Sequence, residues 1–160
     1  MNLKAILQEY GFFILCKIML VSNNKDFIEN GFSEKAKLKI KGYDKIREIW
    51  GNMNVEFHDS EILSLNMSKE IVMTINVVGP LPDNATVEDW NNSKWYQLVI
   101  LFEDIWEVYI ETQWLLIGGI TFNGNASFFE LDGGHGLIFH SDTLGYITCS
   151  DIKIKEVNEC

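Results

Sequence analysis

The sequence contains little proline and little cysteine. Its two prolines both lie in Pro80-Leu81-Pro82, and the composition gives no sign of long disordered regions. Its three cysteines, Cys16, Cys149 and Cys160, are odd in number and widely spaced. That pattern argues against a disulfide framework and fits a reducing compartment.

The sequence also lacks an export signal and a long apolar segment. The apolar run at 12–21 is interrupted by Lys17, and no small-x-small cleavage site follows it. It is also shorter than the roughly 20 residues that span a bilayer. We therefore expect a cytoplasmic protein without a membrane partner, in which residues 1–22 form a helix that gives way to a buried strand after Gly11.

Positive charge is scarce in residues 56–151, which hold Lys69 and Lys94 against fifteen acidic residues. Residues 1–55 hold nine basic and six acidic residues, and the whole chain has a net charge of −10. Such a surface repels the phosphates of nucleic acids and attracts basic proteins. The same charge also favours plain solubility, so it indicates a type of partner rather than requiring one.

Common motifs of catalysis and nucleotide binding are absent. Neither Gly118-Gly119 nor Gly133-Gly134 has the flanking residues of a phosphate-binding loop, and there is no G-x-S-x-G or Cys-x-x-Cys. Cys149 lies in a strand pattern without a nearby histidine, which predicts a buried small residue rather than a nucleophile. The sequence therefore predicts no catalytic residue, no metal and no cofactor.

The 160 residues suit one α+β domain, dominated by an antiparallel β-sheet or sandwich, with one or two short N-terminal helices. Apolar spacing predicts a helix at 43–50 that ends at Gly51. Alternation with lysines predicts a half-buried strand at 36–40. Later strands are expected at 61–67, 70–78, 95–102, 106–111, 115–122, 126–131, 136–140 and 145–157, with turns at 103–104, 123–125 and 132–134 and a long loop at 79–93.

Residues 55–65, V-E-F-H-D-S-E-I-L-S-L, place two carboxylates in an apolar strand pattern. In a continuous strand Asp59 and Glu61 would share one face with Phe57, Leu63, Leu65 and Met67. Because unpaired carboxylates on a buried face are costly, we expect a break at 58–60 and a regular strand from about Glu61. The predicted structural corner consists of Phe57, His58, Asp59 and Glu61.

A chemical interpretation of the corner is the alternative. A small metal-dependent hydrolase would need ligands from elsewhere, and the candidates are His58, Asp59, His135, His140 and Asp142. Their spacing matches no zinc motif. Strand alternation would also turn His58 away from its acidic neighbours.

Tryptophans and acidic residues occur together in residues 83–114. Aromatic side chains rimmed by acids can bind a basic protein, and a sugar-binding module is the alternative. We expect Trp106 in the core and Trp90 exposed in the long loop. Glu107 and Glu111 are an even number of residues apart and so project from one face of a strand, opposite Trp106. The predicted partner-binding residues are Trp90, Glu103, Asp104, Glu107 and Glu111.

Residues 57–65 resemble the F-H-D-(A/S)-E-hydrophobic-L-x-L motif of a family of predicted immunity proteins from bacterial polymorphic toxin systems. Residues 101–105 are similar to its second landmark, F-x-(D/N)-hydrophobic at the end of a strand, and residues 149–154 to its closing strand. The resemblance covers about residues 43–157, so residues 1–42 would be an N-terminal extension of the single domain. It implies a cytosolic protein without catalytic residues that binds and neutralises a cognate toxin domain. Many such toxins are basic nucleases, whose cleft an acidic surface would cover.

Overall fold

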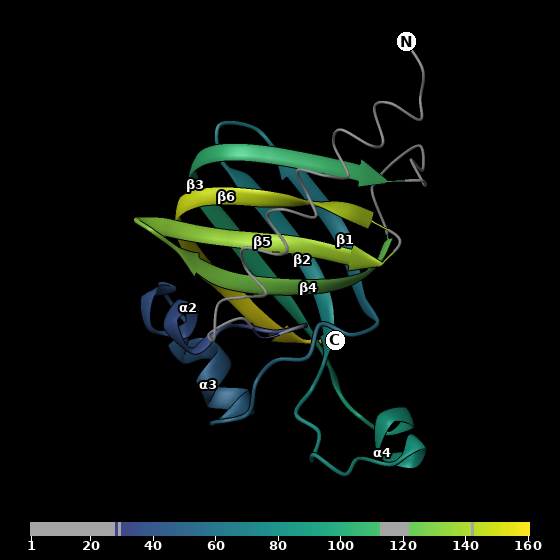
Figure 1. Ribbon diagram of the computed structural model, residues 1–160. Helices are drawn as coiled ribbons and strands as arrows, with labels where there is room; N and C mark the ends of the chain where they lie inside the picture. Colours follow the sequence, from purple (N-terminus) through teal and green to yellow (C-terminus); the bar gives the residue numbers. More distant parts are fainter. Residues whose placement is uncertain (1–27, 29, 113–121, 142) are drawn as a thin grey trace.

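The computed structural model describes residues 28, 30–112, 122–141 and 143–160. Six antiparallel strands close into a barrel in the order β1-β2-β3-β6-β5-β4 (Figure 1). This confirms the predicted α+β fold dominated by antiparallel strands, and closure into a barrel adds to that prediction. The strands are β1 (Ser60–Met67), β2 (Ile71–Val78), β3 (Trp95–Thr112), β4 (Phe122–Leu131), β5 (Gly134–Ser141) and β6 (Thr143–Glu159).

Three short helices lie below the barrel in the view of Figure 1: α2 (Glu34–Lys39), α3 (Asp44–Trp50) and α4 (Val87–Asn91). Helix α3 confirms the helix predicted at 43–50, and Gly51 ends it with a φ of 61°. Helix α4 lies within the predicted loop at 79–93 and was not expected. In the part of the chain that the structure describes, no helix is long and apolar enough to cross a membrane.

Helix α2 shows that the strand predicted at 36–40 is wrong. The Ser33 hydroxyl accepts a hydrogen bond from the Ala36 amide at 3.1 Å and caps the helix. Ala36 and Ile40 are both buried, whereas Leu38 between them is 78% exposed. Burial therefore repeats every four residues, as in a helix, and not every two residues, as in a strand.

A single strand, β3, spans the residues that were predicted to form two strands, at 95–102 and 106–111, joined by a turn at 103–104. Its pairing with β6 continues through this point, from Glu103 opposite Asp151 to Ile105 opposite Cys149. Asp104 takes up the change of direction with a φ of 51°, a conformation that Asp tolerates better than most residues. The predicted turn is therefore a bend within one strand.

A second predicted turn, at 123–125, lies inside strand β4. Gly124 pairs with Ser60 and Asn123 with Glu61, and these contacts join β4 to β1 and close the barrel. The hairpin predicted at 132–134 is confirmed, because Leu131 pairs with Gly134 across a two-residue connection. The predictions for residues 1–22, Trp114 and the apolar run at 115–121 lie outside the described residues.

The core fills the barrel and continues into the segment before α2. Phe32 is fully buried, with its ring centroid 4.5 Å from that of Phe128 and 5.2 Å from that of Phe57. Backbone hydrogen bonds also join Ser33 to Phe128 at 2.9 Å and Lys41 to Ile152 at 3.0 Å. Residues 30–42 thus pack directly against the barrel.

Strand β1 begins at Ser60, the last residue of the predicted break at 58–60 and one residue before the predicted start at about Glu61. The expected alternation within it is wrong, because the register with β2 shifts between Ile62 and Ser64. This bulge turns fully buried Ile62 inward and leaves Leu63 only partly buried, while Leu65 still packs against the core.

Candidate partner-binding surfaces

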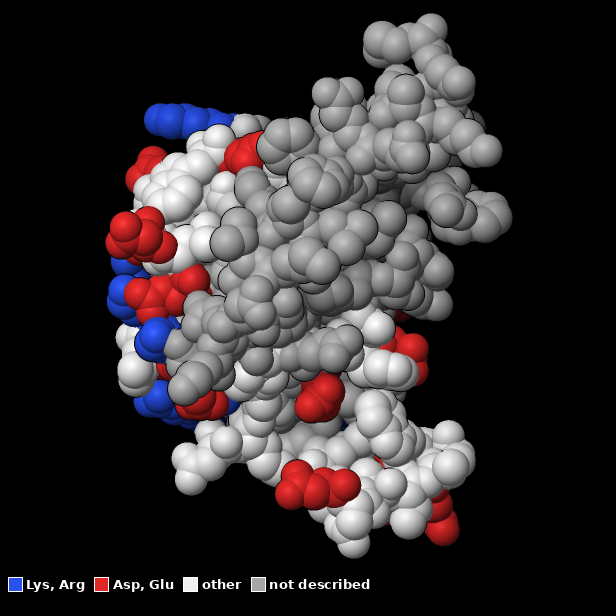
Figure 2. Space-filling model, in the orientation of Figure 1, with Lys and Arg blue, Asp and Glu red and all other residues white. Residues whose placement is uncertain are grey.

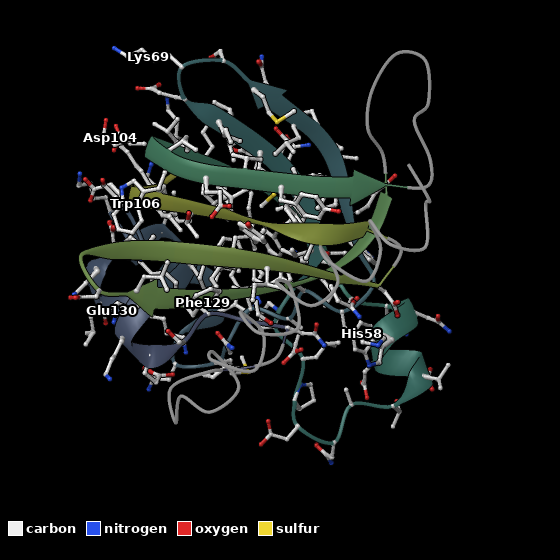
Figure 3. All side chains as sticks on the ribbon, turned by 45° about the horizontal axis from the view of Figure 1, so that its top comes forward. His58, Lys69, Asp104, Trp106, Phe129 and Glu130 are labelled. Atoms are coloured by element: carbon white, nitrogen blue, oxygen red, sulfur yellow. The ribbon has the colours of Figure 1, made fainter. Side chains whose placement is uncertain are left out.

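The bend in β3 forms an exposed surface at one end of the barrel. We call it the bend surface and define it by Glu103, Asp104, Trp106 and Glu107 of β3 and Asp151 of β6. Figure 3 shows Asp104 and Trp106 close together, between the β1–β2 turn at Lys69 and Glu130 of β4. The surface thus places three of the five predicted partner-binding residues around a tryptophan.

Trp106 was predicted to be buried, and the structure shows that this is wrong. The register between β3 and β6 shifts between Ile105 and Glu107, so Trp106 is the extra residue of a β-bulge. Its side chain is 50% exposed. The bulge interrupts the strict alternation from which an inward-facing Trp106 was predicted.

The exposed Trp106 side chain is nevertheless held in place. Its indole Nε1 donates a hydrogen bond to Ser150 Oγ at 3.1 Å. Its ring covers Gly134, where an added Cβ would lie 2.4 Å from Trp106 Cη2. A rigid, half-exposed indole loses little conformational freedom on binding, which suits a contact residue.

The charges of the bend surface are mostly negative. Lys41 lies 3.0 Å from an Asp151 oxygen and 3.7 Å from a Glu103 oxygen, and these carboxylates raise its pKa, with the Asp151 hydrogen bond contributing most. Asp104 is exposed and has no ion pair within the described part of the chain. Along the left margin of Figure 2, acidic groups alternate with basic groups at this end of the molecule.

Glu107 extends the surface along β3. Its Oε1 accepts a hydrogen bond from the Tyr146 hydroxyl at 2.7 Å, and the rings of Tyr109 and Tyr146 lie 6.0 Å apart. The backbone of Glu111 pairs with Leu144, but its side chain lies outside the described part of the structure.

Trp90 lies just before the start of β3, whereas the bend surface lies near the middle of that strand. At roughly 3.3 Å per residue, the eight residues from Trp95 to Glu103 span about 26 Å. Trp90 belongs to α4, which Figure 1 shows standing away from the barrel, and its side chain is 37% exposed as predicted. The structure therefore does not bring Trp90 together with Glu103, Asp104 and Glu107.

The predicted corner at 57–61 contains a buried part and an exposed part. Phe57 is fully buried, and Ser60 Oγ donates to the Phe57 carbonyl at 2.9 Å. Asp59 has a φ of 56°, and its amide donates to Asn125 Oδ1 at 3.1 Å. His58 Nδ1 lies 2.8 Å from Asp59 Oδ2, on the side of the molecule opposite Trp106 in Figure 3. These contacts link the turn before β1 to β4.

Two candidate ligands of the alternative metal site lie on β5, and two lie in the turn before β1. His135 and His140 lie five residues apart, which corresponds to about 17 Å along a strand. The backbone of His140 pairs with Asn125 near the corner, but its side chain and all of Asp142 lie outside the described residues. Within the described ranges, no group of three or more His, Cys, Asp and Glu residues could hold a metal ion.

His135 and Cys149 face each other on neighbouring strands and are both buried. Burial lowers the pKa of His135 and raises that of the Cys149 thiol to about 12. Both effects favour the neutral forms, so the thiol is inert rather than nucleophilic at neutral pH. Cys149 is buried as the sequence predicted.

Comparisons with protein-family models, with curated proteins and with solved structures found no match to this chain.

Proposed function

We propose that the chain is an immunity protein, which binds and neutralises a cognate toxin domain by protein–protein association in the bacterial cytoplasm. The proposal begins from the resemblance of residues 57–65 and needs no cofactor. The observation that supports it best is the bend surface, where the rigid indole of Trp106 stands among Glu103, Asp104 and Glu107. Tryptophan is enriched among the residues that contribute most to binding at protein interfaces.

The charge of the bend surface favours a basic partner. Carboxylates around a contact residue accelerate encounter with a positively charged surface, and they repel nucleic acid. If the toxin is a nuclease, its substrate cleft offers such a basic surface, and an acidic protein would occupy it in place of phosphates. Trp106 would then supply desolvated contact area at the centre of the interface.

A rescue experiment tests the proposed function. The C-terminal domain of the protein encoded immediately upstream is expressed in bacteria with and without this chain, and the pair is then purified. We expect the domain alone to stop growth, co-expression to restore growth, and the two proteins to elute together from a sizing column. Toxicity without rescue and without a complex would contradict the proposal.

Isosteric variants then test the role of the bend surface. Asp104→Asn with Glu107→Gln removes two charges and keeps both the positive φ at 104 and a hydrogen-bond acceptor for Tyr146. We expect slower association, by about tenfold at low salt, and a weaker dependence of that rate on salt. The matched control neutralises Glu48 and Glu156, two exposed acids outside the bend surface. Equal association rates for the two double variants would remove the bend surface from the interface.

A further inference from the structure

The loop between β2 and β3 is held in shape by its own hydrogen bonds, although its helix contains no buried residue. We call residues 79–94 the α4 loop. The Gly79 amide donates to the Lys94 carbonyl at 2.7 Å and closes the base of the loop. Lys94 Nζ in turn lies 2.8 Å from a Glu159 carboxylate oxygen at the end of β6. The loop therefore leaves the barrel from a fixed base.

The rest of the α4 loop is also constrained. Both prolines of the chain lie in its first arm, at Pro80 and Pro82, where each fixes φ. A capping box starts α4: Asp89 N donates to Thr86 Oγ1 at 3.2 Å, and Thr86 N donates to Asp89 Oδ2 at 2.7 Å. These hydrogen bonds lower the pKa of Asp89. They also fix the first turn of α4, so the short helix is already formed before any partner binds.

This order does not result from packing, because α4 contains no buried residue. Its two apolar side chains stay outside the core, with Val87 78% and Trp90 37% exposed. They are three residues apart and therefore share one face of the helix. A preformed helix whose apolar face lies outside the core is the form in which short helices enter apolar grooves of partner proteins.

We propose that the α4 loop is a second binding element, which inserts Val87 and Trp90 into an apolar pocket with a basic rim on the toxin domain. The basic rim follows from charge: the α4 loop contains Asp83, Glu88 and Asp89, and its single basic residue, Lys94, is paired with Glu159 at the base. Acidic side chains project at the bottom of Figure 2, where the loop lies. The inference rests on the proposed function, but it concerns a surface about 26 Å along β3 from the bend surface.

The test measures binding of full-length variants to the purified toxin domain. Trp90→Ala should weaken affinity by about 30-fold or more, as expected for a tryptophan that fills an apolar pocket of the partner. The matched control is Leu38→Ala, which truncates a side chain that is 78% exposed on α2 and should leave affinity unchanged. Because Trp90 supports no core packing, the melting temperatures of both variants should equal that of the unmodified chain.

A third variant tests whether the preformed helix matters. Thr86→Val removes the capping oxygen and leaves Val87 and Trp90 in place, so affinity should fall by about fivefold, the effect expected for a lost helix cap. If the unmodified chain binds the toxin domain and Trp90→Ala binds as well as Leu38→Ala, the inference is overturned and the proposed function stands. If the unmodified chain forms no complex, both are overturned.

Discussion

The Trp106 indole occupies the space that a side chain at Gly134 would need. An added Cβ would lie 2.4 Å from Trp106 Cη2 and 2.3 Å from the Cys149 carbonyl oxygen. The glycine at the start of β5 therefore leaves room for an indole from β3, which lies on the far side of β6 in the sheet. The orientation of Trp106 on the bend surface depends on this one missing side chain.

Gly134→Ala should destabilise the protein by about 1–3 kcal/mol, the usual range for overpacking, and should displace the Trp106 indole. Urea unfolding measures the first effect, and a red shift of tryptophan fluorescence, absent in a Trp106→Phe background, identifies the second. The control is Gly133→Asn, because the φ of 78° at this position suits Asn and no atom lies near its added Cβ. Equal stability of Gly134→Ala and Gly133→Asn would contradict the prediction.

Phe32→Ala should reduce the free energy of unfolding by about 3–5 kcal/mol, because the ring is fully buried among Phe57 and Phe128. Leu38→Ala, six residues later and largely exposed, should change it by less than about 0.5 kcal/mol. Chemical denaturation of both variants makes the comparison. A small effect at Phe32 would mean that residues 30–42 are dispensable for the barrel.

Asp59→Ala should destabilise the protein by about 1 kcal/mol, because alanine adopts a positive φ less readily than Asp. Asp59→Gly should be closer to neutral, since glycine has no Cβ to clash. Neither variant should change binding to the toxin domain if the corner is structural. Normal stability of Asp59→Ala with loss of binding would instead assign the corner to the interface.

Stability should fall as the pH drops below about 6.5, the ordinary pKa of histidine. Burial lowers the pKa of His135 in the folded protein, so below that pH the unfolded state binds more protons than the folded state. The charged groups that also act on His135 are Asp151, Glu130, Lys39 and Lys41. Urea midpoints at pH 5 and pH 7 measure the effect, and His135→Gln should reduce the difference between them. An unchanged difference would show that other groups cause it.

The two described cysteines should differ sharply in reactivity. Cys160 is exposed, whereas Cys149 is buried and has a pKa of about 12. Iodoacetamide at pH 8 should therefore modify Cys160 and spare Cys149 until urea unfolds the chain. Mass spectrometry of the tryptic peptides distinguishes the two sites. Rapid modification of Cys149 in the folded protein would contradict its place in the core.

Patterns of nearby residues in the sequence correctly predicted those elements whose ends are set by residues close to them in the chain. Helix α3 follows from apolar spacing and ends at a glycine, and the hairpin at Asp132-Gly133 follows from its turn residues. The break before Ser60 follows from carboxylates that the inner face of a strand cannot accept. Together these local features were enough to predict an α+β fold rich in antiparallel strands.

Where the spacing of apolar residues fitted both a helix and a strand, the sequence alone led to the wrong choice. Ala36 and Ile40 lie four residues apart, which suits one face of a helix and also one face of a strand. The helix is the form in which this segment packs beside Phe32 and β4. Trp106 is a similar case, because strict alternation predicts an inward side chain and a single extra residue reverses it.

The sequence by itself determined the acidity of the protein, its strand-rich composition and the position of the β4–β5 hairpin. Only the tertiary structure decided the closure of β4 onto β1, the bend at Asp104 and the exposure of Trp106, because each depends on pairing between segments far apart in the chain. It also separated Trp90 from Glu103. An extended strand adds roughly 3.3 Å for every residue, so the eight residues from Trp95 to Glu103 place about 26 Å of strand between the α4 loop and the bend surface.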